Sequence, residues 1–306
     1  MTDQMHVIVV MAPSGALVNR VLIENAVSAV QGQVVEAHRV AVPVSLADHR
    51  EVVKFLIDCP DPEKLSAQLR QLSDEHGADI ALQSRLSRCR PYGLAVFDMD
   101  STLISCEVID ELARVAGVGA EVAEITDRAM RGELDFDESF RTRLALLEGL
   151  DAGAVDELAD QLPVQSGLSE MATTLKARGL KLAIFSVGFI PIAERLKSDY
   201  GFDHVVANEL EIRGGKVTGK VVPPIVNREY KAEALGALAS RLGIHTEHCI
   251  AVGDGANDLS MMALAGLGVA FHAKPAVRAA SPIEITHIGL DGVCYLMGHE
   301  GEFAAA

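Results

Sequence analysis

Residues 94–102 read Leu-Ala-Val-Phe-Asp-Met-Asp-Ser-Thr, four apolar residues followed by two aspartates that are two positions apart. A short run of apolar residues is typical of a strand that is buried on both faces of a parallel sheet. Further runs of this kind stand at residues 182–185, 249–252 and 267–271, with helical segments between them. This alternation predicts an α/β fold, with a Rossmann-like parallel sheet covered by helices on both faces.

Chemically active side chains stand at the carboxyl ends of these runs, where ligands bind in open parallel sheets. They are Asp98 and Asp100 after the first run, Ser186 after the second and Asp254 after the third. Clustered carboxylates suit a hard cation such as Mg²⁺, and Ser186 together with Lys231 suits phosphoryl oxygens. An isolated D-x-D at a strand end is most often a turn, but the features in this order together predict a phosphate-handling site.

Residues 107–165 have helical periodicity and no predicted strand, so we expect a helical cap inserted over the sheet. This segment carries 15 acidic and 5 basic residues. Phe136, Phe140 and Arg143 share one helix face, where phenylalanines are more often core than pocket residues. An arginine on an apolar face of so acidic a segment suits a carboxylate ligand, and Glu107 suits an ammonium group.

The N-terminal 84 residues have a different pattern. Strands are predicted at residues 6–12, 34–44, 52–57 and 80–83, with helices at residues 17–30 and from Pro62 to Gly77. This βαββαβ order is ferredoxin-like and resembles ACT-type regulatory modules, which bind amino acids and often pair between subunits. Phe55 is the only Phe, Tyr or Trp in residues 1–90, which argues against an RNA-binding sheet. An amino-acid effector site, a homodimer contact and a purely structural role therefore all stay open.

The composition limits the location and the partners. The net charge of −16 disfavours nucleic acid, and no apolar run reaches the ~18–20 residues that a membrane span needs. The N-terminus does not resemble a signal peptide, and the five scattered cysteines fit a reducing cytoplasm. We expect a cytoplasmic protein with two domains, at residues 1–88 and 89–306, the second of which contains the cap at about 107–165.

The motifs together resemble the haloacid dehalogenase superfamily, and within it the phosphoserine phosphatases over residues 92–298. The matching positions are Asp98-Met99-Asp100-Ser101-Thr102, Ser186, Lys231 and Gly253-Asp254-Gly255-Ala256-Asn257-Asp258. The resemblance implies magnesium-dependent hydrolysis of O-phospho-L-serine to L-serine and phosphate through an aspartyl phosphate, the last step of serine biosynthesis.

The resemblance also implies a role for each matching residue. Asp98 is expected to be the nucleophile, and Asp100 the general acid and then the general base. The metal ion would be held by Asp98, Asp254 and the backbone carbonyl of Asp100. The other implied roles are phosphate binding by Ser186, Val187, Lys231 and Asn257, support of Lys231 or a metal-bound water by Asp258, and substrate binding by Glu107, Met130, Phe136 and Arg143.

One position departs from the family pattern. The family commonly has a glycine directly after the serine of the second motif, whereas this chain has Val187 followed by Gly188. Valine keeps the backbone N–H but does not easily adopt a positive φ. The geometry of this phosphate donor is therefore a question for the structure.

Three other functions remain open from the sequence. A phosphotransferase would pass the phosphoryl group from Asp98 to an alcohol instead of water. A phosphatase could also act on another small phosphomonoester. A non-catalytic amino-acid sensor is disfavoured, because every position that the chemistry needs is retained.

Overall fold

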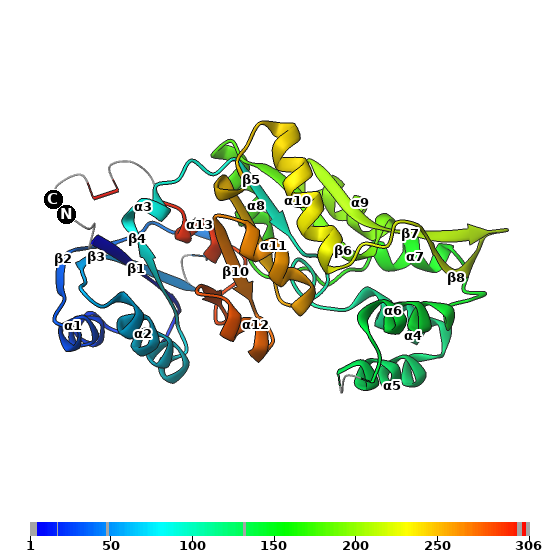
Figure 1. The fold of residues 1–306 in the computed structure, drawn as a ribbon, viewed down its shortest axis with the longest axis horizontal. Helices are drawn as coiled ribbons and strands as arrows, with labels where there is room; N and C mark the ends of the chain where they lie inside the picture. The colour runs from blue at the N-terminus through cyan, green and yellow to red at the C-terminus, as the bar shows by residue number, and fades with distance from the viewer. Residues whose placement is uncertain (1–4, 17, 47–48, 131–132, 299–301, 304–306) are drawn as a thin grey trace. The chain divides into compact units, whose positions relative to one another are not determined.

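The structure is a computed structural model that describes residues 5–16, 18–46, 49–130, 133–298 and 302–303. Figure 1 shows its helices and strands. The chain divides into two compact units. Unit 1 comprises Met1–Tyr92, Ser166–Arg178 and Gly268–Ala306, and unit 2 comprises Gly93–Gln165 and Gly179–Leu267.

Unit 1 contains a four-stranded antiparallel sheet with the strand order β2-β3-β1-β4. The chain order is β1 (Met5–Pro13), α1 (Arg20–Ala29), β2 (Gln33–Arg39), β3 (Arg50–Asp58), α2 (Pro62–His76) and β4 (Asp79–Ser84). The ferredoxin-like order predicted for these residues is confirmed. The predicted end of the second strand at residue 44 was wrong: β2 ends at Arg39, and the short helix η1 (Val44–Leu46) follows Pro43, which has no N–H to donate to a strand ladder.

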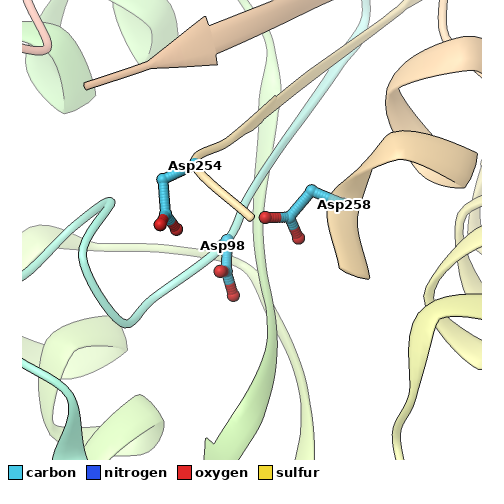
Figure 2. Close-up of side chains that lie close together, drawn as sticks. All are labelled: Asp98, Asp254 and Asp258. Carbon is cyan, nitrogen blue, oxygen red and sulfur yellow. The ribbon is translucent and has the colours of Figure 1, made fainter. Parts of the chain in front are cut away.

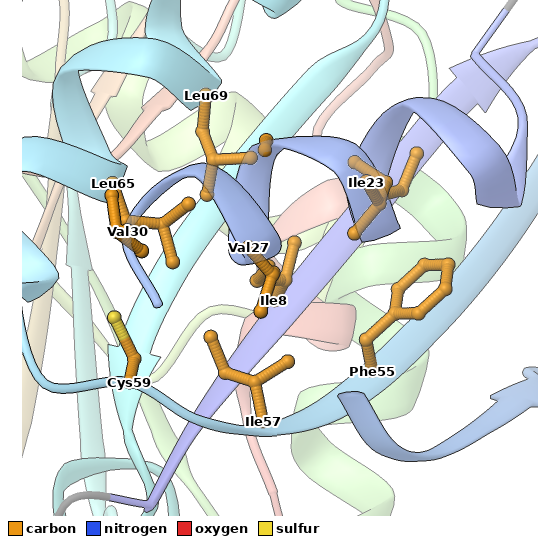
Figure 3. Close-up of a cluster of buried hydrophobic side chains, with 11 residues drawn as sticks. Ile8, Ile23, Val27, Val30, Phe55, Ile57, Cys59, Leu65 and Leu69 are labelled. Carbon is orange, nitrogen blue, oxygen red and sulfur yellow. The ribbon is translucent and has the colours of Figure 1, made fainter. Parts of the chain in front are cut away.

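Apolar side chains from two strands and two helices form the core of this sheet module (Figure 3). Each member named here is at most 2% exposed: Ile8, Phe55 and Ile57 from the sheet, Ile23 and Val27 from α1, and Leu65 and Leu69 from α2. In the strands these side chains come from alternate residues, and in each helix they lie on one face, as the strand and helix periods require. Burial of these side chains is the main free-energy gain that holds the module together.

The ends of α2 follow from its local sequence. The Asp61 carboxylate accepts a hydrogen bond from the Lys64 backbone N–H at 3.1 Å, and Pro62 occupies the first turn, where its missing N–H costs nothing. Gly77 ends the helix with φ of 64°, a conformation that glycine adopts without strain. Both predicted ends of this helix are confirmed.

Two buried charged side chains tie the sheet module to the C-terminal part of unit 1. Arg88, at the end of α3 (Arg85–Arg88), donates to the backbone carbonyls of Tyr295, Leu296 and Met297 and to the Glu302 carboxylate. The Asp79 carboxylate accepts hydrogen bonds from the backbone N–H groups of residues 286–288.

The other elements of unit 1 are α8 (Leu168–Ala177), β10 (Leu267–Phe271), α12 (Pro275–Ala280), β11 (Glu284–Ile285) and α13 (Gly292–Leu296). Strand β10 belongs to this unit from Gly268 onward, since its first residue, Leu267, is the last residue of unit 2.

Unit 2 is built on a mainly parallel sheet. β5 (Leu94–Phe97) lies between β9 (Cys249–Gly253) and β6 (Lys181–Phe189) and is parallel to both. Next along this sheet, β7 (His204–Arg213) is parallel to β6 and forms an antiparallel hairpin with β8 (Lys216–Val222). The parallel arrangement and the hairpin were both predicted and are confirmed.

The cap predicted at about residues 107–165 is helical. It consists of α4 (Val108–Ala116), α5 (Gly119–Met130), α6 (Phe136–Ala145) and α7 (Gly153–Ala159). The remaining elements of unit 2 are α9 (Ile190–Tyr200), α10 (Arg228–Leu242), η2 (Thr246–His248), η3 (Ala256–Asp258) and α11 (Leu259–Leu264). Across the described parts of the chain, none of the helices combines the length and apolar character that crossing a membrane requires.

Candidate active site

Strand register places the predicted reactive residues together. Phe97, the last residue of β5, pairs with Ile184 of β6 on one side and with Val252 of β9 on the other. Asp98 comes directly after Phe97, Ser186 comes two residues after Ile184, and Asp254 comes two residues after Val252. The three side chains therefore lie at the same edge of the sheet. A backbone hydrogen bond from Asp98 N–H to the Val252 carbonyl, at 2.9 Å, continues this alignment beyond β5.

Three buried carboxylates meet at this edge, as Figure 2 shows. Asp98, Asp254 and Asp258 each offer an oxygen within 4.8 Å of the others. Burial, and next the negative charge of Asp98, raise the pKa of Asp258 to about 7. Such mutual repulsion is relieved by a cation, and clustered carboxylate oxygens are the ligands that hard divalent ions prefer. The donor set therefore fits a divalent metal ion.

Lys231 supplies a fixed positive charge to the cluster. It is fully buried on α10, and its Nζ donates to Asp98 Oδ1 at 2.7 Å and to Asp258 Oδ1 at 2.8 Å. Burial opposes its charge, but the carboxylates of Asp258 and Asp98 together raise the pKa of Lys231 above its ordinary value. Both oxygens of Asp258 accept hydrogen bonds, Oδ1 from Lys231 and Oδ2 from the Gly255 N–H, whereas Lys231 contacts only Oδ1 of Asp98. Asp98 and Asp254 are therefore the carboxylates better placed to serve a metal ion.

Asp100 has the electrostatic environment of a protonated acid. Burial raises its pKa well above the ordinary value, and the charges of Glu107 and Asp98 raise it further. Its Oδ1 atom is buried and finds no hydrogen-bond partner within the described parts of the chain. The next residue, Ser101, has φ of 59°, a left-handed conformation that is uncommon outside glycine and is often found at functional sites. A carboxyl group held neutral in this way can donate a proton.

The second motif makes its close approach at Gly188 and not at Val187. The Ser186 Oγ accepts a hydrogen bond from the Gly188 N–H at 2.8 Å. A Cβ on Gly188 would lie 2.6 Å from Met99 Cε and 3.1 Å from Asp100 Oδ2, so a larger residue does not fit without displacing them. Among the described residues, the non-glycine positions with positive φ do not include Val187. The valine therefore keeps its N–H without backbone strain.

Asn208 is a site residue that the sequence reasoning missed. This fully buried side chain donates from Nδ2 to the Val187 carbonyl at 2.6 Å, and its Oδ1 accepts from the Val226 N–H at 2.9 Å. It thereby connects the Ser186 loop to the segment that leads into α10. The only sequence signal was an asparagine inside a strand-like run, where that residue is uncommon.

Asn257 lies in the turn after β9. Its side chain is half-buried, and its Nδ2 lies 3.5 Å from Asp258 Oδ1, the limit of a hydrogen bond. The Asp258 Oδ2 in turn accepts from the Gly255 N–H at 3.0 Å. A Cβ on Gly255 would lie 2.2 Å from Asn257 Oδ1, so a larger residue here would have to displace the Asn257 side chain. The turn therefore holds Asn257 beside the acidic cluster.

The cap contributes two charged side chains, Arg143 and Glu107, near the aspartate motif. Burial lowers the pKa of Arg143, while the nearby carboxylates of Asp110, Glu107 and Asp100 oppose this effect. Among the residues that the structure describes, the buried Arg143 Nε has no hydrogen-bond partner. Glu107 accepts a hydrogen bond from Ser101 Oγ at 2.9 Å, which places it beside the aspartate motif. An unpaired guanidinium nitrogen near these acids is a ready donor for a further ligand.

The two remaining predicted substrate contacts are less defined. Phe136 is 41% exposed and stacks on Phe140, with ring centroids 6.4 Å apart. Phe140 in turn lies 6.4 Å from the ring of Phe189, at the end of β6. Met130 is the last residue of α5, and its side chain lies outside the part of the chain that the structure describes.

Comparison with known proteins assigns the family. Residues 95–263 match the family described as haloacid dehalogenase-like hydrolase. The chain belongs to this family. It is 45% identical over 243 residues to a phosphoserine phosphatase of Mycobacterium tuberculosis, a match that covers 79% of this chain and 59% of that protein. A phosphoserine phosphatase of Vibrio cholerae is 46% identical over 205 residues, 67% of this chain and 62% of that protein. The matches thus span less than two thirds of these two relatives.

Solved structures show the same fold. A haloacid dehalogenase family hydrolase of Salmonella enterica is 31% identical, with a TM-score of 0.83 over 96% of this chain and 99% of that chain. A substrate-bound phosphoserine phosphatase complex is 39% identical, with a TM-score of 0.64 over 68% of this chain and 99% of that chain. The α/β fold with a parallel sheet is therefore shared with members of this family.

Proposed function

We propose that the protein hydrolyses O-phospho-L-serine to L-serine and phosphate, with Mg²⁺ and a phosphorylated Asp98. One observation carries the chemistry: the buried Asp98 carboxylate lies against Lys231 and beside Asp254 and Asp258 at the carboxyl edge of a parallel sheet. The names of the relatives support the choice of substrate. This reaction supplies serine, and so we place the protein at the last step of serine biosynthesis.

In the first half-reaction, an Asp98 carboxylate oxygen attacks phosphorus and the bond from phosphorus to the serine oxygen breaks. Asp100, held protonated by its surroundings, gives its proton to the departing alkoxide. In the second half-reaction, Asp100 removes a proton from water, which attacks the aspartyl phosphate and releases phosphate. Asp98 is then free for the next turnover.

The phosphoryl group needs positive charge and hydrogen-bond donors around it. Lys231, Ser186, Asn257 and the Val187 N–H are proposed to bind its oxygens. The Asp98 and Asp254 carboxylates and the Asp100 backbone carbonyl would hold Mg²⁺, which neutralises charge on the transferring group. Asp258 keeps Lys231 in position, through the 2.8 Å hydrogen bond already present.

The cap is proposed to recognise the serine part of the substrate. Arg143, with its unpartnered Nε, would bind the carboxylate, and Glu107 would bind the ammonium group. Phe136 and Met130 would cover the ligand and exclude water. We further propose a domain boundary at residues 88/89 and an ACT-like module before it, which binds an amino-acid effector or contributes to a homodimer.

A phosphate-release assay tests this function. With Mg²⁺ present, the purified chain is expected to release phosphate from L-phosphoserine, and less from D-phosphoserine or phosphothreonine. EDTA should stop the reaction and added Mg²⁺ should restore it, because the carboxylates of Asp98 and Asp254 repel each other and the substrate without a cation. Chromatography should identify free serine as the product. Absence of release from L-phosphoserine under these conditions would contradict the proposal.

Replacing Arg143 by alanine should act on one substrate and spare another. We expect kcat/KM for phosphoserine to fall by about ten- to a hundredfold, the effect of losing a charge-assisted contact to a carboxylate. Activity toward p-nitrophenyl phosphate, which has no carboxylate, should change little. Arg141→Ala is the matched control, since Arg141 lies two residues away, is exposed and pairs with Asp137. Equal losses on both substrates would remove Arg143 from substrate recognition.

A further inference from the structure

Unit 1 contains a pocket that the proposed catalysis does not use. Its volume is ≈ 270 Å³, slightly below the usual range for sites that hold drug-sized ligands, so it suits a small metabolite. Residues 40–43, a stretch of Val-Ala-Val-Pro between β2 and η1, form an apolar part of the lining. The polar part includes Lys54, Glu170, Arg178, Asp291 and Tyr295.

Two cations from different elements line this pocket. Lys54 on β3 is 5% exposed and forms an ion pair with Glu302. Burial, and next the positive charge of Arg88, lower the pKa of Lys54 to about 8; Glu302 opposes this effect and Arg178 adds to it. Arg178 follows α8 and is exposed, and within the described residues its side chain has no ion pair or hydrogen bond. An anion between these two cations would relieve their repulsion.

Both acidic side chains of the lining have partners in the fold, although among the described residues Oδ1 of Asp291 completes no hydrogen bond. Asp291 forms an ion pair with Arg50 at 3.4 Å, and Glu170 accepts a hydrogen bond from Ser45 Oγ at 2.8 Å. The Tyr295 hydroxyl is buried and interacts with the Asp291 carboxylate, but among the described residues this contact does not reach full hydrogen-bond geometry. A ligand oxygen in line with the hydroxyl would accept the hydrogen bond that Asp291 does not complete.

We propose that this pocket binds a small organic carboxylate, with Arg178 and Lys54 contacting the carboxylate and residues 40–43 contacting its hydrocarbon part. The apolar stretch favours an organic acid over a bare inorganic anion such as phosphate. All of the residues involved belong to unit 1, whereas the acidic cluster and its lysine belong to unit 2. The inference therefore does not depend on the proposed phosphatase reaction.

Ligand-observed NMR on the full chain, without substrate or divalent cation, tests the proposal. Butyrate is the probe, and butyramide is its neutral counterpart of nearly the same shape. Butyrate is expected to bind and butyramide is not. Arg178→Ala should weaken butyrate binding about tenfold, the scale of one charge-assisted contact. Tyr295→Phe should weaken it less, since it removes one neutral donor and keeps the ring.

Lys176→Ala is the matched control, because Lys176 is an exposed cation on α8, two residues before Arg178, and does not line the pocket. This variant should bind butyrate like the parent chain. The proposal is wrong if butyrate does not bind, if butyramide binds equally well, or if Arg178→Ala keeps the parent affinity. A failed phosphatase assay would leave these binding results unaffected, so the two proposals fail separately.

Raising the pH provides a second test of the same pocket. Lys54 faces Arg88, Arg178 and Glu302. Between about pH 7 and pH 9 Lys54 should lose its proton, an interval in which arginine and glutamate side chains do not ordinarily titrate. Burial raises the pKa values of the pocket residues Cys294 and Tyr295, so both stay neutral in this range. Butyrate affinity should therefore fall as the pH rises. An affinity that stays constant over this interval would rule out a contact with Lys54.

Discussion

Asp98→Asn should reduce phosphate release from phosphoserine by at least about 10⁴-fold, the scale seen when a nucleophile is removed from a covalent mechanism. Asparagine has nearly the same shape as aspartate, but its amide is not a nucleophile toward phosphorus. It also removes one of three buried carboxylates whose oxygens lie within 4.8 Å of one another. Relief of that repulsion should offset the weaker contact with Lys231, so the protein should fold normally. Phosphate release and thermal unfolding measure the two effects.

Asp199→Asn provides the control for this prediction. Asp199 is exposed on α9 and pairs with Arg195, so the same chemical change there should leave phosphate release unchanged. In the parent enzyme, rapid acid quench with ³²P-labelled phosphoserine should trap radioactivity on the protein, and in Asp98→Asn it should not. Activity of Asp98→Asn near the parent level would show that another residue is the nucleophile.

Lys231→Met should destabilise the protein as well as inactivate it. Methionine keeps much of the side-chain volume, but the two carboxylates that the ammonium group contacts at 2.7 and 2.8 Å would be left unpaired. Removing one partner of a buried ion pair typically lowers the free energy of unfolding by about 3–5 kcal/mol. Urea unfolding in the presence of EDTA measures this loss without compensation by a bound cation. Activity should fall in parallel, because the transferring phosphoryl group loses its fixed positive charge.

The loss of stability should depend on pH in a defined direction. The pKa of Asp258 is about 7 in the folded protein, and removal of Lys231 should raise it further. A carboxyl group whose pKa is higher in the folded than in the unfolded state loses stability as the pH rises toward its folded value. Lys231→Met should thus be more destabilised relative to the parent at about pH 8 than at about pH 5.5.

Lys181→Met is the matched control for the lysine. Lys181 is half exposed and forms its ion pair with Asp203 at the surface, where such pairs contribute about 0–1 kcal/mol. Its replacement should change the free energy of unfolding little at either pH. A loss of equal size in both lysine variants would show that the buried pair at Asp98 has no special importance for stability.

Local sequence was enough to predict the order of the helices and strands in the N-terminal module and the main strands of the parallel sheet. α2 begins at Asp61 and Pro62 and ends at Gly77 because each residue has a strong preference for its place at a helix end. The buried strand β5 was recognisable from four consecutive apolar residues, and the aspartates directly after it from the motif. Where such a signal was weak, as at the end of β2, the prediction extended too far.

The sequence by itself determined which residues are candidates for the proposed chemistry: the positions of Asp98, Asp100, Ser186 and Asp254 at strand ends follow from local patterns of two to four residues. Only the tertiary structure decided which of these groups are neutral, paired or unpartnered. The pKa of Asp100 is raised mainly by burial in the folded chain. The pairing of Lys231 with Asp258 and the bridge made by Asn208 arise between separate segments of the chain. The physical reason is that burial and Coulomb interaction depend on distances in space, which strand order and register set and local sequence does not contain.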